Sequence, residues 1–258
     1  MIELNKTINW KPEATGSGRF GNWLENLVDW NLSRSRYWGT PLPIWRTEDG
    51  KYEICISSVE MLSNEIEKSI AAGYMKKNPY KDYKNYDSFD LHRPYIDSVI
   101  LVAPNGEKMT RESDLIDVWF DSGAMPYAQV HYPFDCNDEQ LANNFPADFI
   151  AEGVDQTRGW FYSLMAISTL LFNKAPYKNV IVLGHVLDKN GQKMSKSLGN
   201  VRWAKDVIEM LGADVVRWLM LSVHYRGELN FSDETIETAK TELNKVKMAL
   251  KQAELKIA

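Results

Sequence analysis

The sequence has few of the features that mark secreted, metal-binding or membrane proteins. Its 258 residues include two cysteines, Cys55 and Cys136, which lie far apart and form no Cys-x-x-Cys pair. This spacing argues against a disulfide framework and against a cysteine zinc site. No stretch approaches the ~18 uninterrupted apolar residues of a membrane span, and the amino terminus has no signal-peptide pattern. We therefore expect a cytoplasmic protein with no membrane contact and no bound structural metal.

An excess of positive charge is also missing. The net charge of −5 argues against broad electrostatic capture of nucleic acid, although a local basic patch stays open. Apolar residues make up 44% and charged residues 25%, as in ordinary soluble proteins. The length is sufficient for one large or two small domains with a real core.

What the sequence does contain is concentrated between residues 180 and 200. Val180–Gly184 is rich in β-branched residues, which predicts a strand buried on both faces. After a turn at Asn190-Gly191, a polar loop carries Lys193 and Lys196. Two point charges on a mobile loop after a buried strand suit a polyphosphate ligand. For a lone Lys-x-x-Lys, a solvated surface turn is the alternative.

The preceding stretch predicts a strand over 146–151 and a helix over 156–172, with Asp155 as its N-cap. The helix is apolar nearly all round and should be sandwiched. With the strand at 180–184 it forms a strand–helix–strand crossover with parallel strands. Ligands bind outside the carboxyl ends of such strands. Four residues are therefore expected beside the lysine loop: Glu152, Gly153, Asp155 and Gln156.

Three strings carry a family resemblance. Lys-Met-Ser-Lys-Ser at 193–197 resembles the signature loop of class I aminoacyl-tRNA synthetases. The string Gly-Arg-Phe-Gly-Asn-Trp through Arg-Tyr-Trp-Gly at 18–39, and Glu-Gly-Val-Asp-Gln-Thr-Arg-Gly-Trp-Phe at 152–161, resemble isoleucyl-tRNA synthetases. The resemblance covers about residues 1–200. It implies an α/β fold, namely the second half of a Rossmann-like parallel-sheet catalytic domain with an α+β insertion and a helical C-terminal segment.

The same resemblance organises the chain into four segments. Residues 1–45 re-enter the catalytic domain, 46–112 form the α+β insertion, 113–200 form the catalytic half, and 201–258 lead to an anticodon-binding bundle. Within the insertion we expect hairpins at Asp49-Gly50 and Asn105-Gly106, a helix over 59–72, and an exposed loop over 74–86.

Further elements are expected outside the insertion. A short helix is expected over 22–29, and the segment 117–123 should turn from a strand end into a loop. Helices are expected over 203–211 and 214–223, and Ser232 should cap a long helix. One apolar stripe, from Ile236 to Ile257, predicts a single buried face on that helix, which needs a partner helix.

The resemblance implies ATP-dependent activation of isoleucine and its transfer to tRNA(Ile), with Mg²⁺ accompanying ATP. Lys193 and Lys196 would close on the triphosphate in the transition state. The residues Glu152, Gly153, Asp155 and Gln156 would cradle the ribose and adenylate. Trp119 and Trp160 would surround the isoleucine side chain, and for Trp160 a packing role in the core is the alternative.

Three departures from the family pattern limit this interpretation. No His-x-Gly-His occurs, so the chain resembles the second half of the catalytic fold alone, and we expect weak or no activity. The editing domain and most of the anticodon-binding domain of the family are also absent. The segment 222–232 resembles cysteinyl enzymes more closely. A synthetase for another amino acid such as cysteine, or a non-catalytic module that binds tRNA or a partner protein, therefore stays open, as does the oligomeric state.

Overall fold

The computed structural model describes residues 1–224 and 227–257. The chain divides into two compact units, one formed by Met1–Leu27 with Val130–Ala258 and the other by Val28–Gln129. The four-segment division expected from the sequence stays a prediction. Part of the cysteinyl-like segment, residues 225 and 226, lies outside the described residues.

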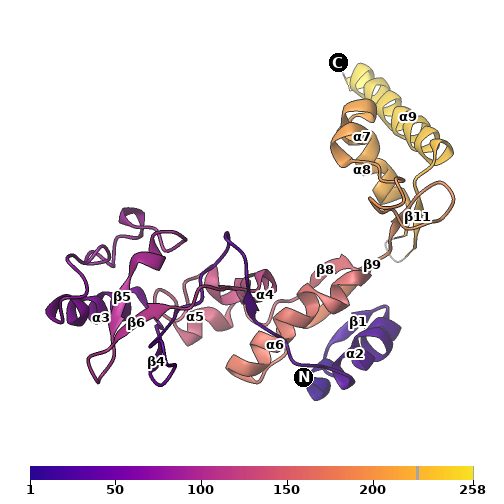
Figure 1. Ribbon diagram of the computed structural model, residues 1–258. Helices are drawn as coiled ribbons and strands as arrows, with labels where there is room; N and C mark the ends of the chain where they lie inside the picture. Colours follow the sequence, from indigo (N-terminus) through magenta and orange to yellow (C-terminus); the bar gives the residue numbers. More distant parts are fainter. Residues whose placement is uncertain (225–226, 258) are drawn as a thin grey trace. The chain divides into compact units, whose positions relative to one another are not determined.

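The first unit contains a three-stranded parallel sheet (Figure 1). Its strand order is β1 (Asn9–Lys11), β9 (Asn179–Leu183), β8 (Ile150–Gly153). A turn of 3-10 helix, η4 (Val154–Arg158), and helix α6 (Trp160–Phe172) connect β8 to β9. The predicted strand–helix–strand crossover is confirmed. The ladder of β8 starts later than expected, and only an isolated bridge at Ala147 extends it toward residue 146.

Aromatic side chains fill the core beside this sheet. Trp10 lies at 5.0 Å from Phe20 and 5.8 Å from Phe161 between ring centroids. A Cβ on Gly16 would lie 2.2 Å from the Trp10 ring, so only glycine fits there. The amino-terminal elements are α1 (Ile2–Asn5), the π-helical η1 (Thr15–Phe20) and α2 (Gly21–Glu25). Helix α2 starts one residue before the predicted helix and ends four residues earlier.

The rest of this unit is mostly helical. Its elements are α5 (Asp138–Ala142), β10 (Val186–Leu187), α7 (Ala204–Leu211), α8 (Ala213–Ser222), β11 (Leu229–Asn230) and α9 (Asp233–Ile257). The predicted helix end at Gly212 is confirmed, and this residue has a φ of +80°. Ser232 Oγ accepts a hydrogen bond from the Thr235 amide at 3.3 Å, which confirms the predicted cap of α9.

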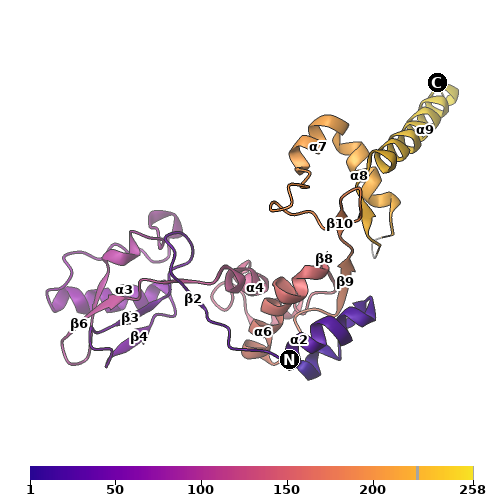
Figure 2. The same cartoon turned by 45° about the vertical axis from the view of Figure 1, so that its right-hand side comes forward.

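The apolar stripe of α9 is buried only in part. Ile236 and Ala239 join the core of α7 and α8, whereas Val246 and Leu250 are exposed. The side chain of Ile257 lies outside the described residues. Figure 2 shows the later turns of α9 extending beyond α7 and α8. The stripe is therefore covered only over its first turns, and its later positions still lack a partner helix among the described residues.

The second unit is built on a four-stranded antiparallel sheet. Its order is β4 (Glu53–Cys55), β3 (Ile44–Arg46), β6 (Lys108–Arg111), β5 (Ile100–Val102). Helix α3 (Val59–Ala71) packs on β5. Both predicted hairpins and the predicted helix are confirmed. The other elements are β2 (Ser33–Arg34), η2 (Tyr86–Ser88), η3 (Ile96–Ser98), β7 (Leu115–Ile116) and α4 (Val118–Ala128).

One expectation for this unit is wrong, and a second holds only in part. The segment predicted as a loop after residue 117 is helix α4, because Asp117 caps it by accepting from the Trp119 amide at 3.2 Å. The stretch 74–86 is not wholly exposed, because the Tyr80 side chain is buried and its hydroxyl donates to the Asp90 carbonyl. Burial raises the pKa of Tyr80 to about 12.

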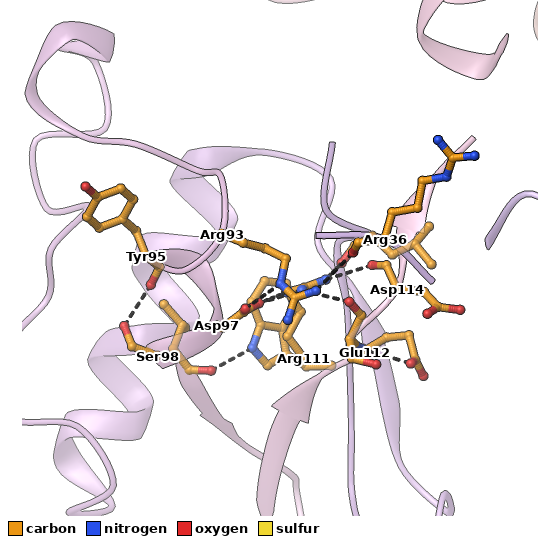
Figure 3. Close-up of polar contacts among 12 residues, drawn as sticks. Arg36, Arg93, Tyr95, Asp97, Ser98, Arg111, Glu112 and Asp114 are labelled. Carbon is orange, nitrogen blue, oxygen red and sulfur yellow. Dashed lines mark hydrogen bonds and ion pairs between the residues drawn. The ribbon is translucent and has the colours of Figure 1, made fainter. Parts of the chain in front are cut away.

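The buried side chain of Arg111, the last residue of β6, makes several polar contacts (Figure 3). Arg111 Nε donates to Asp97 Oδ1 at 2.9 Å, and Arg93 Nε donates to Asp97 Oδ2 at 2.8 Å. A second Arg93 nitrogen donates to the Arg36 carbonyl at 3.1 Å. The Arg111 side chain is only 1% exposed. The Asp97 carboxylate of η3 thus binds Arg111 of β6 and Arg93, and Arg93 in turn binds the backbone at Arg36.

Candidate functional site

Two exposed carboxylates gather where β8 ends. Glu152 and Gly153 are the last residues of the strand, in register with Val182 and Leu183 of β9. Because the two strands are parallel, their carboxyl ends lie at the same edge of the sheet. The Glu152 side chain is exposed there, and Asp155 follows in η4, also exposed. The carboxyl edge of β8 therefore presents hydrogen-bond acceptors to solvent.

Gly153 lets the Asp155 carboxylate fold back over the strand end. A Cβ at residue 153 would lie 2.7 Å from Asp155 Oδ1. Any side chain there would push the carboxylate away. The glycine therefore keeps this backbone open to a close approach.

The predicted N-cap role of Asp155 is wrong. Helix α6 begins only at Trp160, and its N-cap is Gly159. The η4 turn intervenes, and it brings Gln156 over the first turn of α6. Gln156 Oε1 accepts from the Trp160 amide at 3.0 Å. The Asp155 carboxylate is thus not consumed by the helix.

Residues that the sequence analysis did not single out support this turn. Thr157 is buried, donates to the Val154 carbonyl at 2.8 Å, and accepts from Arg19 Nε at 2.9 Å. The Arg158 guanidinium lies 5.2 Å from the centre of the Trp23 ring. Both residues stand in the polar stretch that precedes the apolar helix. The contacts of Thr157 and Arg158 hold η4 against the core, whereas Asp155 lies on its exposed side.

The loop that carries Lys193 and Lys196 lies between β10 and α7. Both lysine side chains are exposed. Lys196 Nζ lies 5.3 Å from the centre of the Trp203 ring, within the range of a cation–π contact. Gly191 and Gly199 have φ values of +74° and +67°, a region that glycine enters at no steric cost. These two glycines set the bends that bracket the lysines.

The structure does not bring all predicted site residues into contact. No hydrogen bond or ion pair within the described residues links Glu152–Gln156 to Lys193–Ser197. Trp160 is half-buried against the core of the parallel sheet. Trp119 lies in the first turn of α4, in the other compact unit, and is 42% exposed. Its place beside Trp160 stays a prediction.

Across residues 1–224 and 227–257, no group of three or more His, Cys, Asp or Glu side chains is placed to hold a metal ion. None of the helices in this part of the chain is both long and apolar enough to cross a bilayer. Cys55 and Cys136 are free thiols.

The family of the chain follows from comparison with known proteins. Residues 1–232 match the family described as tRNA synthetases class I (I, L, M and V). The chain therefore belongs to the class I tRNA synthetases, as the signature loop predicts. The match extends through the cysteinyl-like segment 222–232.

Within this family the chain is similar to isoleucine–tRNA ligases. It is 66% identical over 233 residues to that of Bacteroides thetaiotaomicron, covering 86% of this chain and 20% of the relative. It is 63% identical over 222 residues to that of Cytophaga hutchinsonii, covering 86% and 19%. The predicted resemblance to the isoleucyl enzymes is confirmed. The chain spans about a fifth of the length of the relatives it matches.

Solved structures support the fold. The Agrobacterium radiobacter K84 agnB2 LeuRS–tRNA–LeuAMS complex matches with a TM-score of 0.59 at 21% identity, covering 93% of this chain and 31% of that one. Mycobacterium tuberculosis methionyl-tRNA synthetase bound by methionyl-adenylate matches with a TM-score of 0.51 at 18% identity, covering 92% and 33%. The predicted α/β fold class is confirmed.

Proposed function

We propose that this chain supplies the signature-loop side of the adenylate-forming site of an isoleucine–tRNA ligase. The activity is ATP-dependent activation of isoleucine, followed by transfer to tRNA(Ile). The observation that carries the proposal is the loop at 193–197, with two exposed ammonium groups, in a chain 66% identical to an isoleucine–tRNA ligase.

The chemistry requires cations that act as the reaction proceeds. An isoleucine carboxylate oxygen attacks the α-phosphorus of ATP, the bond to the β-phosphate oxygen breaks, and pyrophosphate leaves. Negative charge shifts onto the phosphate oxygens, so positioning and electrostatic stabilisation supply most of the catalysis. Lys193 and Lys196 are the residues proposed to meet this charge. Mg²⁺ would enter with ATP, bound to its phosphates.

The edge of β8 supplies the other half of the proposal. The carboxylates of Glu152 and Asp155 suit ribose hydroxyls, which donate to them. Gly153 leaves room for the nucleotide to approach the backbone. Gln156 uses its Oε1 to cap α6, so its Nε2 donors are the part of that side chain proposed to face the ligand.

The wall for the isoleucine side chain is proposed from Trp160, whereas the role of Trp119, in the other compact unit, stays a prediction of the family resemblance. Indole rings give an isoleucine side chain a large apolar wall, and their N–H groups need polar partners at the rim. Trp160 is half-buried beside the strand edge. Removing the Trp160 side chain should therefore weaken the binding of isoleucyl ligands without abolishing the fold.

Calorimetric titration with a non-hydrolysable isoleucyl-adenylate analogue tests the proposal, with leucyl and cysteinyl analogues for comparison. We expect selective isoleucyl binding, weakened roughly tenfold by Glu152→Ala or Trp160→Ala, the loss typical of one buried or charged contact. Glu209→Ala, an exposed change on α7, is the control. Preference for the cysteinyl analogue would overturn the assignment of isoleucine as the substrate. If the chain binds none of the three analogues, the proposal of an adenylate site in this chain is refuted.

A further inference from the structure

Two side chains connect the ends of the signature loop. Asp188 follows β10 directly, and Asn200 lies after the second lysine, before α7. Asn200 Nδ2 donates a hydrogen bond to Asp188 Oδ2 at 2.9 Å. Both residues are half-buried, whereas the lysines between them are exposed. This contact closes the loop at its base.

Asp188 also organises the first half of the loop. Its Oδ1 accepts from the Asn190 amide at 2.8 Å and from the Gln192 amide at 2.9 Å. Its own amide donates to the Gln192 carbonyl at 2.9 Å. The hydrogen bond from Asn200 and then that from the Gln192 amide lower the pKa of Asp188. The carboxylate is therefore held ionised with each oxygen engaged.

Asn200 organises the second half. Its Oδ1 accepts from the Ser195 amide at 2.9 Å, and its Nδ2 also donates to the Lys193 carbonyl at 3.3 Å. These two backbone groups flank Met194, between the two lysines. One amide side chain thus holds the backbone of Lys193 directly and that of Lys196 through its neighbour Ser195.

We propose that Asp188 and Asn200 are positioning residues that form a latch for the signature loop. A loop ordered only when a ligand arrives subtracts its ordering entropy from the binding free energy. The latch orders the loop backbone before the ligand binds. The lysine Cα atoms are then held in place, and only the side chains have to move to meet the phosphates. The part of this inference that concerns ATP rests on the proposed function; the part that concerns loop order does not.

Tryptic cleavage measures loop order directly, because trypsin cuts after Lys193 and Lys196. Cleavage from the native protein reports how often the loop opens. Asp188→Asn places an amide nitrogen opposite Asn200 Nδ2, and Asn200→Ala removes the clamp. We expect each to raise the cleavage rate at these two sites roughly fivefold relative to the other lysines. Asp206→Asn, the same charge change on exposed α7, should leave both rates unchanged.

Exchanging the two side chains provides the rescue. In the double variant Asp188→Asn with Asn200→Asp, the amide at 188 donates to the carboxylate at 200, so the bond reforms with reversed polarity. We expect cleavage to fall below that of either single variant without returning to the parent rate, because a carboxylate at 200 has no donor for the Lys193 carbonyl. Parent-like cleavage of the single variants, or no recovery in the exchange variant, would overturn the latch.

Ligand affinity then tests positioning rather than general stability. The latch variants should weaken MgATP roughly fivefold and leave the isoleucyl-adenylate analogue unchanged, because that analogue has no β- and γ-phosphates for the lysines to meet. Equal loss for both ligands would show a structural role only. If the parent chain binds neither ligand, the proposed function fails, and the cleavage result still decides whether the latch exists.

Discussion

The Asp97 carboxylate offers the sharpest test of how the second unit is held together. It accepts from Arg111, whose side chain is 1% exposed, and from Arg93, while the Asp97 side chain itself is 31% exposed. Asp97→Asn keeps the size of the side chain, removes its charge and replaces one acceptor oxygen with a donor. The buried guanidinium of Arg111 would then face a neutral amide.

The expected loss can be bounded from these contacts. Removing one partner of a fully buried ion pair costs about 3–5 kcal/mol, and a hydrogen bond to a charged group contributes about 1.5–3 kcal/mol. Solvent reaches about a third of Asp97 and screens part of the loss, and Arg111 keeps bonds to the Leu42 and Asp114 carbonyls. We therefore expect about 2 kcal/mol of local stability to be lost, or roughly a 30-fold larger opening constant.

Hydrogen exchange followed by mass spectrometry measures this locally, which matters because a chain with two units need not unfold in one step. The slowest amides of β5 and β6 should exchange roughly 30-fold faster in Asp97→Asn. Asp82→Asn is the matched control, since Asp82 is exposed in the same unit. A change below about 0.5 kcal/mol, the range of ordinary surface substitutions, would refute the reasoning.

Acid should act on the same contact. Burial alone would raise the pKa of Asp97, but hydrogen bonds from Arg111 and then Arg93 outweigh burial and lower it. The folded pKa thus lies below the unfolded value of about 3.9. The stabilisation is complete above that value and is lost as the pH falls through the folded pKa. Protection of β6, corrected for intrinsic exchange, should hold from about pH 7 to 5 and fall below about pH 4, less steeply in Asp97→Asn.

Three other predictions concern the site and the packing of α9. Gly153→Ala should displace the Asp155 carboxylate and weaken the isoleucyl-adenylate analogue roughly tenfold in calorimetry with the melting temperature retained; unchanged affinity would show that this carboxylate is not used. Trp203→Leu should free the lysine above its ring and strengthen MgATP binding about twofold to fivefold, and weaker binding would mean that the ring assists the ligand. Ile236→Ala should cost about 2–4 kcal/mol in thermal unfolding, whereas Leu250→Ala, at a residue 60% exposed, should stay within about 0.5 kcal/mol. Equal losses at these two positions would show that the whole stripe of α9 is covered.

The elements that the sequence predicts best are those specified by local pattern. The turn dipeptides Asp49-Gly50 and Asn105-Gly106 predict the two hairpins, and Gly50 and Gly106 adopt the positive φ that such turns require. The β-branched run at 180–184 and the apolar helix before it predict the parallel crossover. In each of these cases one local rule and the tertiary packing favour the same structure.

The errors arise where a polar side chain has two possible uses. Asp155 precedes an apolar helix, which predicts that it caps this helix, but an extra 3-10 turn makes Gly159 the N-cap, and Gln156 Oε1 accepts from the Trp160 amide. The segment 117–123 is expected to turn from a strand end into a loop, but the Asp117 carboxylate caps α4 and also accepts from Trp30 Nε1 at 2.9 Å. Which acceptor a donor reaches depends on distances across the chain, and sequence spacing does not contain them.

The same reasoning explains why the candidate site could be located from sequence but its supports could not. Strand ends and signature residues predict where polar groups gather, and they include ligand-binding and scaffolding residues alike. In the structure, hydrogen bonds distinguish the candidate ligand-binding residues from the scaffolding residues. Asp188 and Asn200 are satisfied by the loop itself, whereas Glu152 and Lys193 make no side-chain hydrogen bond or ion pair within the part of the chain that is described. A polar group already satisfied by its own chain would have to give up that bond to hold a ligand. The unsatisfied groups are therefore the better candidates for direct contact with ATP, and the satisfied ones for keeping those groups in place.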